Sequence, residues 1–415
     1  MPPVDLAELA RTFDGEDVRR ACRSTLDGNW REGERRVDGA SFAYTRPSPT
    51  HYPFQWYWDS CFAAIVWRRF DPSRARRELE SLLAARRPDG FIGHTIFWDT
   101  PLNLRQRLTY NVPSASAPMT STIQPPLLAW AWRIAVGDPA GEPAIVAHHE
   151  WLCEHRDLDG DGLIWIIQPD ESGLDSSPQF DGIWAASQTG PLQFVRLLRH
   201  DRRLAFDLRR IVAAGRPVCC EVVTNVLHSL SAMALGRGSL TGAIVERLYD
   251  ERTGLFGPRA RPDARRRHPV TWAALAPLAL PDLPEAIGRR LVEEHLLDAR
   301  KFWLALPPPS VAADDPAFST RDTRFGIRRY WRGPTWVNAA WLLWLGLVRL
   351  GYAAEAELLR TRVCAAVAAA GSREYYDPYT GHGMGAQEFA WSTLVLELLD
   401  PDPRAATSYL PDGAA

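Results

Sequence analysis

In the stretch "PTWVNAAWLLWLGLVRLG", residues 334–351, apolar side chains recur at the spacing of a helix, and this pattern is the main indication of the fold class. Trp341 and Trp344 within it are interpreted as core residues. Segments with the same periodicity recur along the chain, at residues 58–70, 74–87, 125–136, 143–155, 190–212, 221–236, 283–297, 353–370 and 386–399. Period-two alternation is almost absent. We therefore predict an all-α protein with about a dozen helices at intervals of roughly 30 residues.

The segments between these helices differ in length and character. Some are short and polar, whereas others are long and rich in Trp, Tyr, Gly and Pro. The long ones are residues 44–58, 87–118, 157–186, 302–335 and 371–388. Helical hairpins arranged in a ring would gather one set of loops at each end, so the long aromatic loops would converge on one mouth. No heptad pattern is sustained, which favours an (α/α)6 toroid, or six-hairpin barrel, over a bundle.

No composition shift divides the chain, so residues 1–415 are predicted to form a single domain, with N-terminal helices at about residues 4–26 packing on the barrel. The 48 Lys+Arg residues nearly balance the 50 Asp+Glu residues, which disfavours nucleic acid or an anionic membrane as a partner. No apolar run reaches the roughly 18 residues of a membrane span. The acidic N-terminus resembles neither a signal nor a transit peptide, so we expect a cytoplasmic protein. Homo-oligomerisation stays open.

Side-chain chemistry narrows the function further. Lys301 is the only lysine and follows no glycine-rich loop, which excludes a P-loop and disfavours Schiff-base catalysis. The six cysteines form no CxxC pair and are expected to be reduced and mostly buried. The chain has 17 tryptophans, many of them beside glycine, proline or an acid rather than in aliphatic runs. Aromatic rings beside hydrogen-bonding groups suit the apolar faces and hydroxyl rims of a sugar, so this pattern points to carbohydrate.

Four loops carry the residues that could perform chemistry: "YPFQWYWDSCF" (52–62), "ESGLDSSPQF" (171–180), "RRYWRGPTWVN" (328–338) and "REYYDPYTGHGMGAQEFAWS" (373–392). They offer Asp59, Asp175 and either Glu374 or Glu388 as carboxylates. Paired carboxylates in an aromatic cleft are the equipment of glycoside hydrolysis, in which one acid protonates the leaving oxygen and the second activates water or attacks the sugar. Burial against rings would raise the pKa of the acid as this role requires.

These loops resemble those of glycoside hydrolase family 63, and more closely its bacterial mannosylglycerate and glucosylglycerate hydrolases, which are related to trehalases. The resemblance covers roughly residues 40–400 and implies a single (α/α)6 toroid that inverts the anomeric configuration. An "SGxD" motif matches residues 172–175 and makes Asp175 the general acid, whereas Glu171 is expected to orient the loop. An "E-x-Y-[ND]-P-x-T-G" motif matches residues 374–381 and makes Glu374 the base that activates water.

The same resemblance implies a sugar subsite. Its residues are Tyr52, Trp56, Trp58, Asp59, Gln124, Tyr330, Trp331, Arg332, Gly333 and Trp336. Arg332 is equally well interpreted as a buried ion-pair partner that organises its loop. In the members of the family that release glycerate, a basic and a tyrosyl side chain after the acid motif hold the aglycone carboxylate. Here no tyrosine lies between Phe180 and Leu248, and the candidate cations are Arg209, Arg210 and Arg216.

Two patterns resemble metal sites. The run "DLDGDG" (157–162) begins like a calcium loop but has Gln168 at the twelfth position, so it is interpreted as a polar turn. His149 and Cys153, with His148 and His155 nearby, have helical spacing but lack a second cluster and are interpreted as structural. No metal and no cofactor is expected.

The sequence thus predicts an inverting glycoside hydrolase that acts on a small α-glucoside or α-mannoside, such as a glucosylglycerate or mannosylglycerate, with a small sugar as its partner. Trehalose-like disaccharides and short glucosylated oligosaccharides are the alternatives within this class. A sugar epimerase on the same toroid would place His94 and His382 face to face over the sugar. A carbohydrate-binding relative without catalysis is the third alternative.

Overall fold

The computed structural model describes residues 12–36, 38–98, 102, 106, 118–184, 191–262, 269–324 and 327–401. The predicted N-terminal helix is present as α2 (Gly15–Asn29), while residues 4–11 of that prediction lie outside the described residues. Asp14 caps α2 by accepting a hydrogen bond from the Glu16 amide, so the helix begins where an acid can satisfy its first free N–H group.

Six buried segments form the centre of the molecule. They are α3 (Tyr57–Trp67), α6 (Leu128–Ala135), α11 (Val222–Ala234), the 3₁₀ segment η4 (Trp272–Ala279), α14 (Val337–Arg349) and the 3₁₀ segment η7 (Ala390–Leu394). In α14 every residue from Val337 to Leu347 is buried, as expected of a helix that is apolar all round. Each segment packs on the next in chain order, and η7 packs on α3, so their contacts close a ring.

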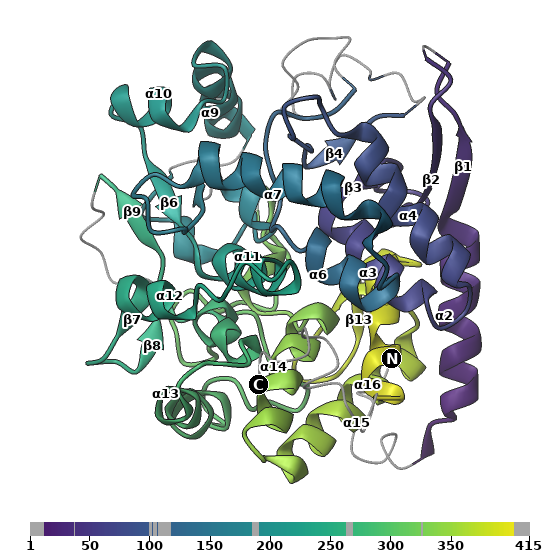
Figure 1. Ribbon diagram of the computed structural model, residues 1–415. Helices are drawn as coiled ribbons and strands as arrows, with labels where there is room; N and C mark the ends of the chain where they lie inside the picture. The colour runs from purple at the N-terminus through teal and green to yellow at the C-terminus, as the bar shows by residue number, and fades with distance from the viewer. Residues whose placement is uncertain are drawn as a thin grey trace.

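A more exposed helix follows most of these central segments in the sequence. These helices are α4 (Pro72–Ala85), α7 (Glu142–Arg156), α12 (Thr241–Leu248), α13 (Glu285–Arg290) with the π-helical η5 (Leu291–Leu296), and α15 (Ala353–Ala370). Near the chain ends, α2 packs on η7 and on α16 (Val395–Leu399). Figure 1 shows this proximity as the purple N-terminal helix beside the yellow C-terminal segment.

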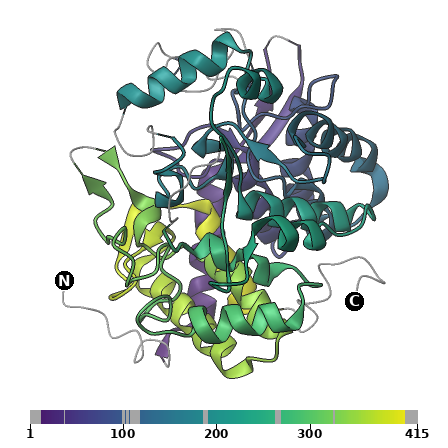
Figure 2. The ribbon, with the colours of Figure 1, turned by 90° about the vertical axis from the view of Figure 1, so that its left-hand side faces the viewer.

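Two helices lie apart from this arrangement. α9 (Pro191–Arg203) and α10 (Leu208–Ala213) lie at the top of the molecule in Figures 1 and 2. The remaining helical turns are short and belong to connecting segments: η1 (Pro139–Gly141), η2 (Pro169–Ser172), η3 (Pro178–Phe180) and η6 (Tyr330–Arg332). Three of these, η2, η3 and η6, flank residues that the sequence assigned to the site.

Short antiparallel sheets, which the sequence did not predict, connect the helices. Within the part of the chain that the structure describes, five have two strands: β1 (Trp30–Glu34) with β2 (Ser41–Thr45), β3 (Gln55–Trp56) with β4 (Thr95–Ile96), β7 (Tyr249–Asp250) with β8 (Leu255–Phe256), β10 (Thr323–Arg324) with β11 (Ile327–Arg328), and β12 (Arg373–Tyr376) with β13 (Gly383–Gln387). The sixth has three strands in the order β5 (Trp165–Ile166), β6 (Val218–Cys220), β9 (Arg259–Arg261). The predicted helix-rich character is confirmed, but strands of two to five residues are too short to produce an alternating pattern.

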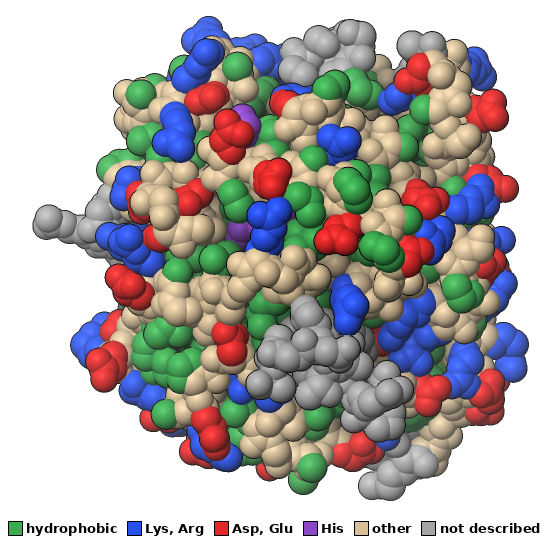
Figure 3. Space-filling model, in the orientation of Figure 1, with side chains coloured by type: hydrophobic (Ala, Val, Ile, Leu, Met, Phe, Trp, Pro, Cys, Tyr) green, Lys and Arg blue, Asp and Glu red, His purple; other side chains and the backbone are tan. Residues whose placement is uncertain are grey.

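One large hydrophobic core connects most of the described elements, and Phe54, Trp56 and Phe97 form a small second cluster. The buried residues of the large core extend from Val18 to Leu398. All six cysteines are free thiols, and only Cys153 is partly exposed, as the sequence predicted. Among the described residues, no helix has the length and apolar character needed to cross a membrane. Basic and acidic side chains are intermixed over the face drawn in Figure 3, in keeping with the near balance of charge.

Candidate active site

The segment that carries Asp175 is a tight turn fixed by its own side chains. The Ser172 hydroxyl donates to the Pro169 carbonyl and accepts from the Leu174 amide. Gly173 ends η2 in the left-handed region at φ +69°, and a Cβ there would stand 2.6 Å from the ring of Trp58. Glycine is therefore required both by the backbone conformation and by the close approach of an indole.

Glu171 anchors this segment to the neighbouring elements through an ion pair and backbone hydrogen bonds. Its carboxylate forms a buried bidentate ion pair with Arg156 at the end of α7, with N–O distances of 2.6 and 2.7 Å. It also accepts hydrogen bonds from the amides of Ile123 and Ile167, at 2.9 and 2.8 Å. The prediction that Glu171 orients the loop is confirmed, because its oxygens are engaged by protein groups on three sides.

Asp175 is half-buried and contacts η6. The Tyr330 phenol donates a 2.6 Å hydrogen bond to its Oδ2 atom. The Ser176 hydroxyl accepts from the Trp331 amide at 3.1 Å, so two adjacent contacts join the acid segment to η6. Burial, followed by the nearby carboxylates of Asp175 and Glu374 and the Tyr52 phenol, raises the pKa of Tyr330 well above its usual value. Tyr330 is therefore a neutral phenol and can serve as a donor over the whole working pH range.

Glu374 lies on β12 and is 2 % exposed. Tyr52 donates to its Oε1 atom and the Ala386 amide on β13 donates to its Oε2 atom, both at 2.8 Å. Gly385 has φ +66°, and a Cβ at this position would lie 2.6 Å from Oε2. The β12–β13 hairpin thus fixes the carboxylate through the backbone, and glycine leaves room for it.

Both carboxylates line one aromatic cavity. All of the predicted site residues except Arg332 and Gly333 line it, and it is completed by Pro47, His94, Gly173, Phe389 and Trp391. Each of the five long loops contributes at least one of these residues, so the predicted convergence of the loops is confirmed. The cavity lies at the N-terminal ends of α3, α14 and η7, where the helix dipole favours negative charge.

The walls of the cavity are stacked and crossed rings. Trp331 and Trp336 stack with centroids 3.7 Å apart, and Trp391 meets both Trp58 and Trp336 edge on, at 5.2 and 5.3 Å. Gln124 fixes the start of α3 by accepting a 3.0 Å hydrogen bond from the Trp58 amide. These contacts leave flat apolar surfaces beside polar groups, which is the arrangement that suits a sugar ring.

Arg332 and Gly333 lie behind the wall. Arg332 is 1 % exposed and forms a bidentate ion pair with Asp181, at 2.8 and 2.5 Å. The structure therefore supports its interpretation as an organising ion-pair partner, and Arg332 is not among the residues that line the cavity. A Cβ at Gly333 would stand 2.3 Å from the Ser319 carbonyl, so this glycine is required by a close backbone contact.

Two further ionisable groups face the cavity. Asp59, in the first turn of α3, has its pKa raised well above the usual value by burial and then by Glu374 and Asp175. This shift favours the protonated form of Asp59, which can both donate and accept hydrogen bonds. Desolvation lowers the pKa of His94 to about 3, so this imidazole is neutral.

Sequence reasoning missed three wall residues. Phe389 and Trp391 lie in the quoted motif "EFAWS", and the Trp391 indole donates to the Glu374 carbonyl at 3.3 Å. Their position at the start of an apolar helix was the available signal. Pro47 gave none.

The rival residues lie elsewhere. Glu388 and His382 are exposed, and neither lines the cavity. His382 therefore does not face His94, which removes the geometry that an epimerase would need. The "DLDGDG" segment is the predicted polar turn: both oxygens of Asp157 accept backbone amides, while Asp159 and Asp161 pair with Arg261 and Arg247.

A larger hollow of 880 Å³ is lined by residues that include Arg247, Tyr249 and Lys301. It contains neither Asp175 nor Glu374. The aromatic cavity, with its two positioned carboxylates, is therefore the better candidate for chemistry. Two acids from different loops, each held by a tyrosine and enclosed by indole rings, define the equipment of a glycoside hydrolase.

Comparison with known proteins also identifies a glycoside hydrolase. Residues 52–392 match the family described as the mannosylglycerate hydrolase MGH1-like glycoside hydrolase domain, and the chain belongs to this family. A mannosylglycerate hydrolase from Rubrobacter radiotolerans is 28% identical over 453 residues, covering 92% of this chain and 96% of the relative. A glucosylglycerate hydrolase from Mycolicibacterium hassiacum is 26% identical over 85% of this chain and 93% of its own length. The predicted family resemblance is confirmed.

Solved structures give the same result. The GH63 mannosylglycerate hydrolase from Thermus thermophilus in complex with glucose has a TM-score of 0.76 and 28% identity, over 92% of this chain and 99% of that one. Neutral trehalase from Saccharomyces cerevisiae has a TM-score of 0.53 at 14% identity, covering 94% and 81% of the two chains, and shows a shared fold alone.

Proposed function

We propose that the protein is an inverting glycoside hydrolase in which Asp175 is the general acid and Glu374 the general base. The single observation that carries this proposal is that both carboxylates line one aromatic cavity while each accepts a hydrogen bond from a different tyrosine. We also propose that the ring of buried segments is the inner ring of an (α/α)6 toroid and that residues 1–415 form one catalytic domain. A cytoplasmic location and homo-oligomerisation stay predictions.

Asp175 would protonate the oxygen that leaves with the aglycone. Tyr330 keeps the carboxyl group oriented in both protonation states, because a phenol donates to a carboxylate and accepts from a carboxylic acid. On the opposite face of the sugar, Glu374 would take a proton from the attacking water as the glycosidic bond breaks. The donors on its two oxygens, Tyr52 and the Ala386 amide, fix its position.

The aromatic walls and the polar side chains of the cavity would bind the sugar. Indole rings cover its apolar faces and exclude bulk water, whereas Asp59, Gln124 and His94 would meet its hydroxyl groups. A small cavity with one polar rim suits a terminal monosaccharide rather than a long chain.

The substrate we propose is a small α-glucoside or α-mannoside such as glucosylglycerate or mannosylglycerate, as the names of the relatives suggest. None of the candidate aglycone cations lines the described cavity. Arg209 donates to the Asp157 carbonyl, and Arg216 contacts His200. The cation that receives an aglycone carboxylate would therefore differ from these, and trehalose-like or oligosaccharide substrates stay alternatives.

The test is a panel of α-glucosides and α-mannosides, including both glycerate conjugates and trehalose, incubated with the purified protein. We expect hydrolysis of at least one glycerate conjugate, and its loss in Asp175→Asn and Glu374→Gln. Glu388→Gln is the matched control, because this exposed acid lies near Glu374 in the sequence but outside the cavity. Turnover in either catalytic variant, or sugar binding without turnover in the unaltered protein, would contradict the proposal.

A further inference from the structure

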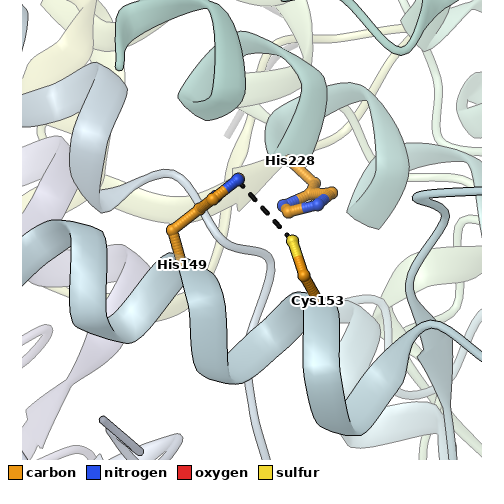
Figure 4. Close-up of side chains that lie close together, drawn as sticks. All are labelled: His149, Cys153 and His228. Carbon is orange, nitrogen blue, oxygen red and sulfur yellow. Dashed lines mark hydrogen bonds between the residues drawn. The ribbon is translucent and has the colours of Figure 1, made fainter. Parts of the chain in front are cut away.

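A second cluster of chemically competent side chains lies away from the cavity, between α7 and α11. His149 and Cys153 belong to α7 and His228 to α11, and their ligand atoms all lie within 4.8 Å of one another. Figure 4 shows the three side chains converging across the gap between the two helices. None of them lines the catalytic cavity.

Helical geometry explains the pairing on α7. His149 and Cys153 are four residues apart, so their side chains lie one above the other on the same face. The His149 Nε2 and Cys153 Sγ atoms are 3.7 Å apart. In the sequence this pair had no third member, because His228 lies 75 residues beyond Cys153 and only the packing of α11 brings it close.

His228 is the unusual member. It is fully buried at 0 % exposure, yet neither of its ring nitrogens has a hydrogen-bond partner of acceptable geometry. Burying a polar group without a partner is costly, and such groups in native structures call for an explanation. A ligand that accepts the lone pair of one ring nitrogen would supply it.

The spacing suits a tetrahedral metal. Zn–S bonds of about 2.3 Å and Zn–N bonds of about 2.0 to 2.1 Å place a sulfur and a nitrogen ligand about 3.5 Å apart. The observed separation of 3.7 Å between Cys153 and His149 is close to this value. The His149 and His228 rings stack with centroids 4.9 Å apart and an interplanar angle of 24°. Because the lone pair lies in the ring plane, one ring would turn out of the stack to aim its nitrogen at an ion shared with the other.

We propose that His149, Cys153 and His228 bind one zinc ion between α7 and α11, with water as the fourth ligand. Two imidazoles and one thiolate are the borderline-soft donor set that zinc prefers. Cys153 is partly exposed, which gives the ion an entry path, while the two histidines form the buried side of the site.

The surrounding charges are compatible with a cation. Glu150 and Asp157 are the acids near the site, and Arg237 is the cation, paired with Glu150 at 3.0 Å. Zinc binds the thiolate form of cysteine, so binding would release the proton of Cys153.

The position of the site indicates what the ion would do. α7 ends at Arg156, which pairs with Glu171 on one side of the Asp175 segment. Glu221 caps the start of α11 and accepts a hydrogen bond from Gln179, which follows Asp175 in the sequence. Zinc would join the two helices that support this segment. Its role is therefore structural, and its loss should lower stability before it changes the chemical step.

The test is cobalt substitution. The protein is treated with a chelator, dialysed and titrated with Co²⁺, whose thiolate charge-transfer band and visible d–d bands report a tetrahedral site containing cysteine. Cys153→Ser is the main variant, because this partly exposed position tolerates a polar group. His228→Asn is the second. His155→Asn is the matched control, since His155 lies on the same helix, is exposed and is outside the cluster.

We expect one equivalent of Co²⁺ per chain, the full spectrum in the control, loss of the thiolate band in Cys153→Ser and loss of the tetrahedral spectrum in His228→Asn. Zn²⁺ should displace the Co²⁺ and raise the melting temperature of the unaltered protein but not that of Cys153→Ser. If the unaltered protein lacks a thiolate band at saturating Co²⁺, or if Cys153→Ser keeps it, the site does not exist and the cluster is a buried histidine pair without a metal.

Discussion

The hydrogen bond from Tyr330 to Asp175 offers a quantitative test of the proposed acid. At 2.6 Å it is a short bond to a half-buried carboxyl group. Hydrogen bonds to charged groups contribute about 1.5 to 3 kcal/mol. Tyr330→Phe removes this stabilisation from the ionised form of Asp175 and leaves the ring in place. Since about 1.4 kcal/mol corresponds to one pH unit, the proton should leave Asp175 about one to two units higher in pH.

The assay is the pH dependence of kcat/KM on the best substrate of the panel. The basic limb of the profile reports loss of the proton from the general acid, and the acidic limb reports protonation of the base. Tyr330 itself does not titrate in this range, because burial and neighbouring carboxylates raise its pKa well above the usual value. Tyr330→Phe should therefore move the basic limb upward by about one unit or more, with a smaller effect on the acidic limb.

Tyr379→Phe is the matched control. Tyr379 is 51 % exposed and outside the cavity, so its loss of a hydroxyl group should leave both limbs unchanged. A basic limb that stays in place in Tyr330→Phe while the acidic limb rises would mean that Tyr330 contacts the base. In that case the assignment of Asp175 as the acid would be wrong.

Three further predictions follow from buried contacts. Tyr52→Phe removes a donor that positions Glu374 and should lower kcat/KM on the best substrate of the panel by about tenfold; an unchanged kcat/KM would contradict a positioning role for this contact. Glu171→Gln breaks a buried ion pair and should lower the free energy of unfolding, measured with denaturant, by about 3 to 5 kcal/mol; a loss below about 1 kcal/mol would contradict its anchoring role. Burial raises the pKa of Glu78 from 4.5 to about 8, so the folded state retains a proton that the unfolded state releases, and stability should fall as the pH rises through this interval. Glu78→Gln should flatten that slope, whereas the matched Glu80→Gln, an exposed acid on the same helix, should not.

Most of the residues that line the cavity could be predicted from the sequence, because they lie in short loop motifs that are recognisable one at a time. Asp175 and Glu374 lie in loops whose glycines have physical reasons: Gly173 makes room for an indole, and Gly385 makes room for the carboxylate. The aromatic loops converge because each one precedes or follows a buried helix with a readable apolar pattern. The apolar pattern of residues 334–351 likewise predicted α14, whose residues from Val337 to Leu347 are buried.

What the sequence could not supply were contacts between distant segments. Arg332 could have faced a sugar or an acid with equal plausibility, and only the position of Asp181 decides. His228 is an ordinary buried histidine until α11 packs beside α7. The short strands have no periodic signal of their own, because strands of two residues are too short to show an alternating pattern.

The stereochemistry of hydrolysis tests the central claim most directly. Proton NMR spectra recorded in the first moments after mixing enzyme with its α-glycoside resolve the two anomers of the released sugar before they equilibrate. If Asp175 protonates the leaving oxygen while Glu374 directs water to the opposite face, the β anomer appears first and the α anomer grows only by mutarotation. Initial release of the α anomer would mean a covalent intermediate and would contradict the account.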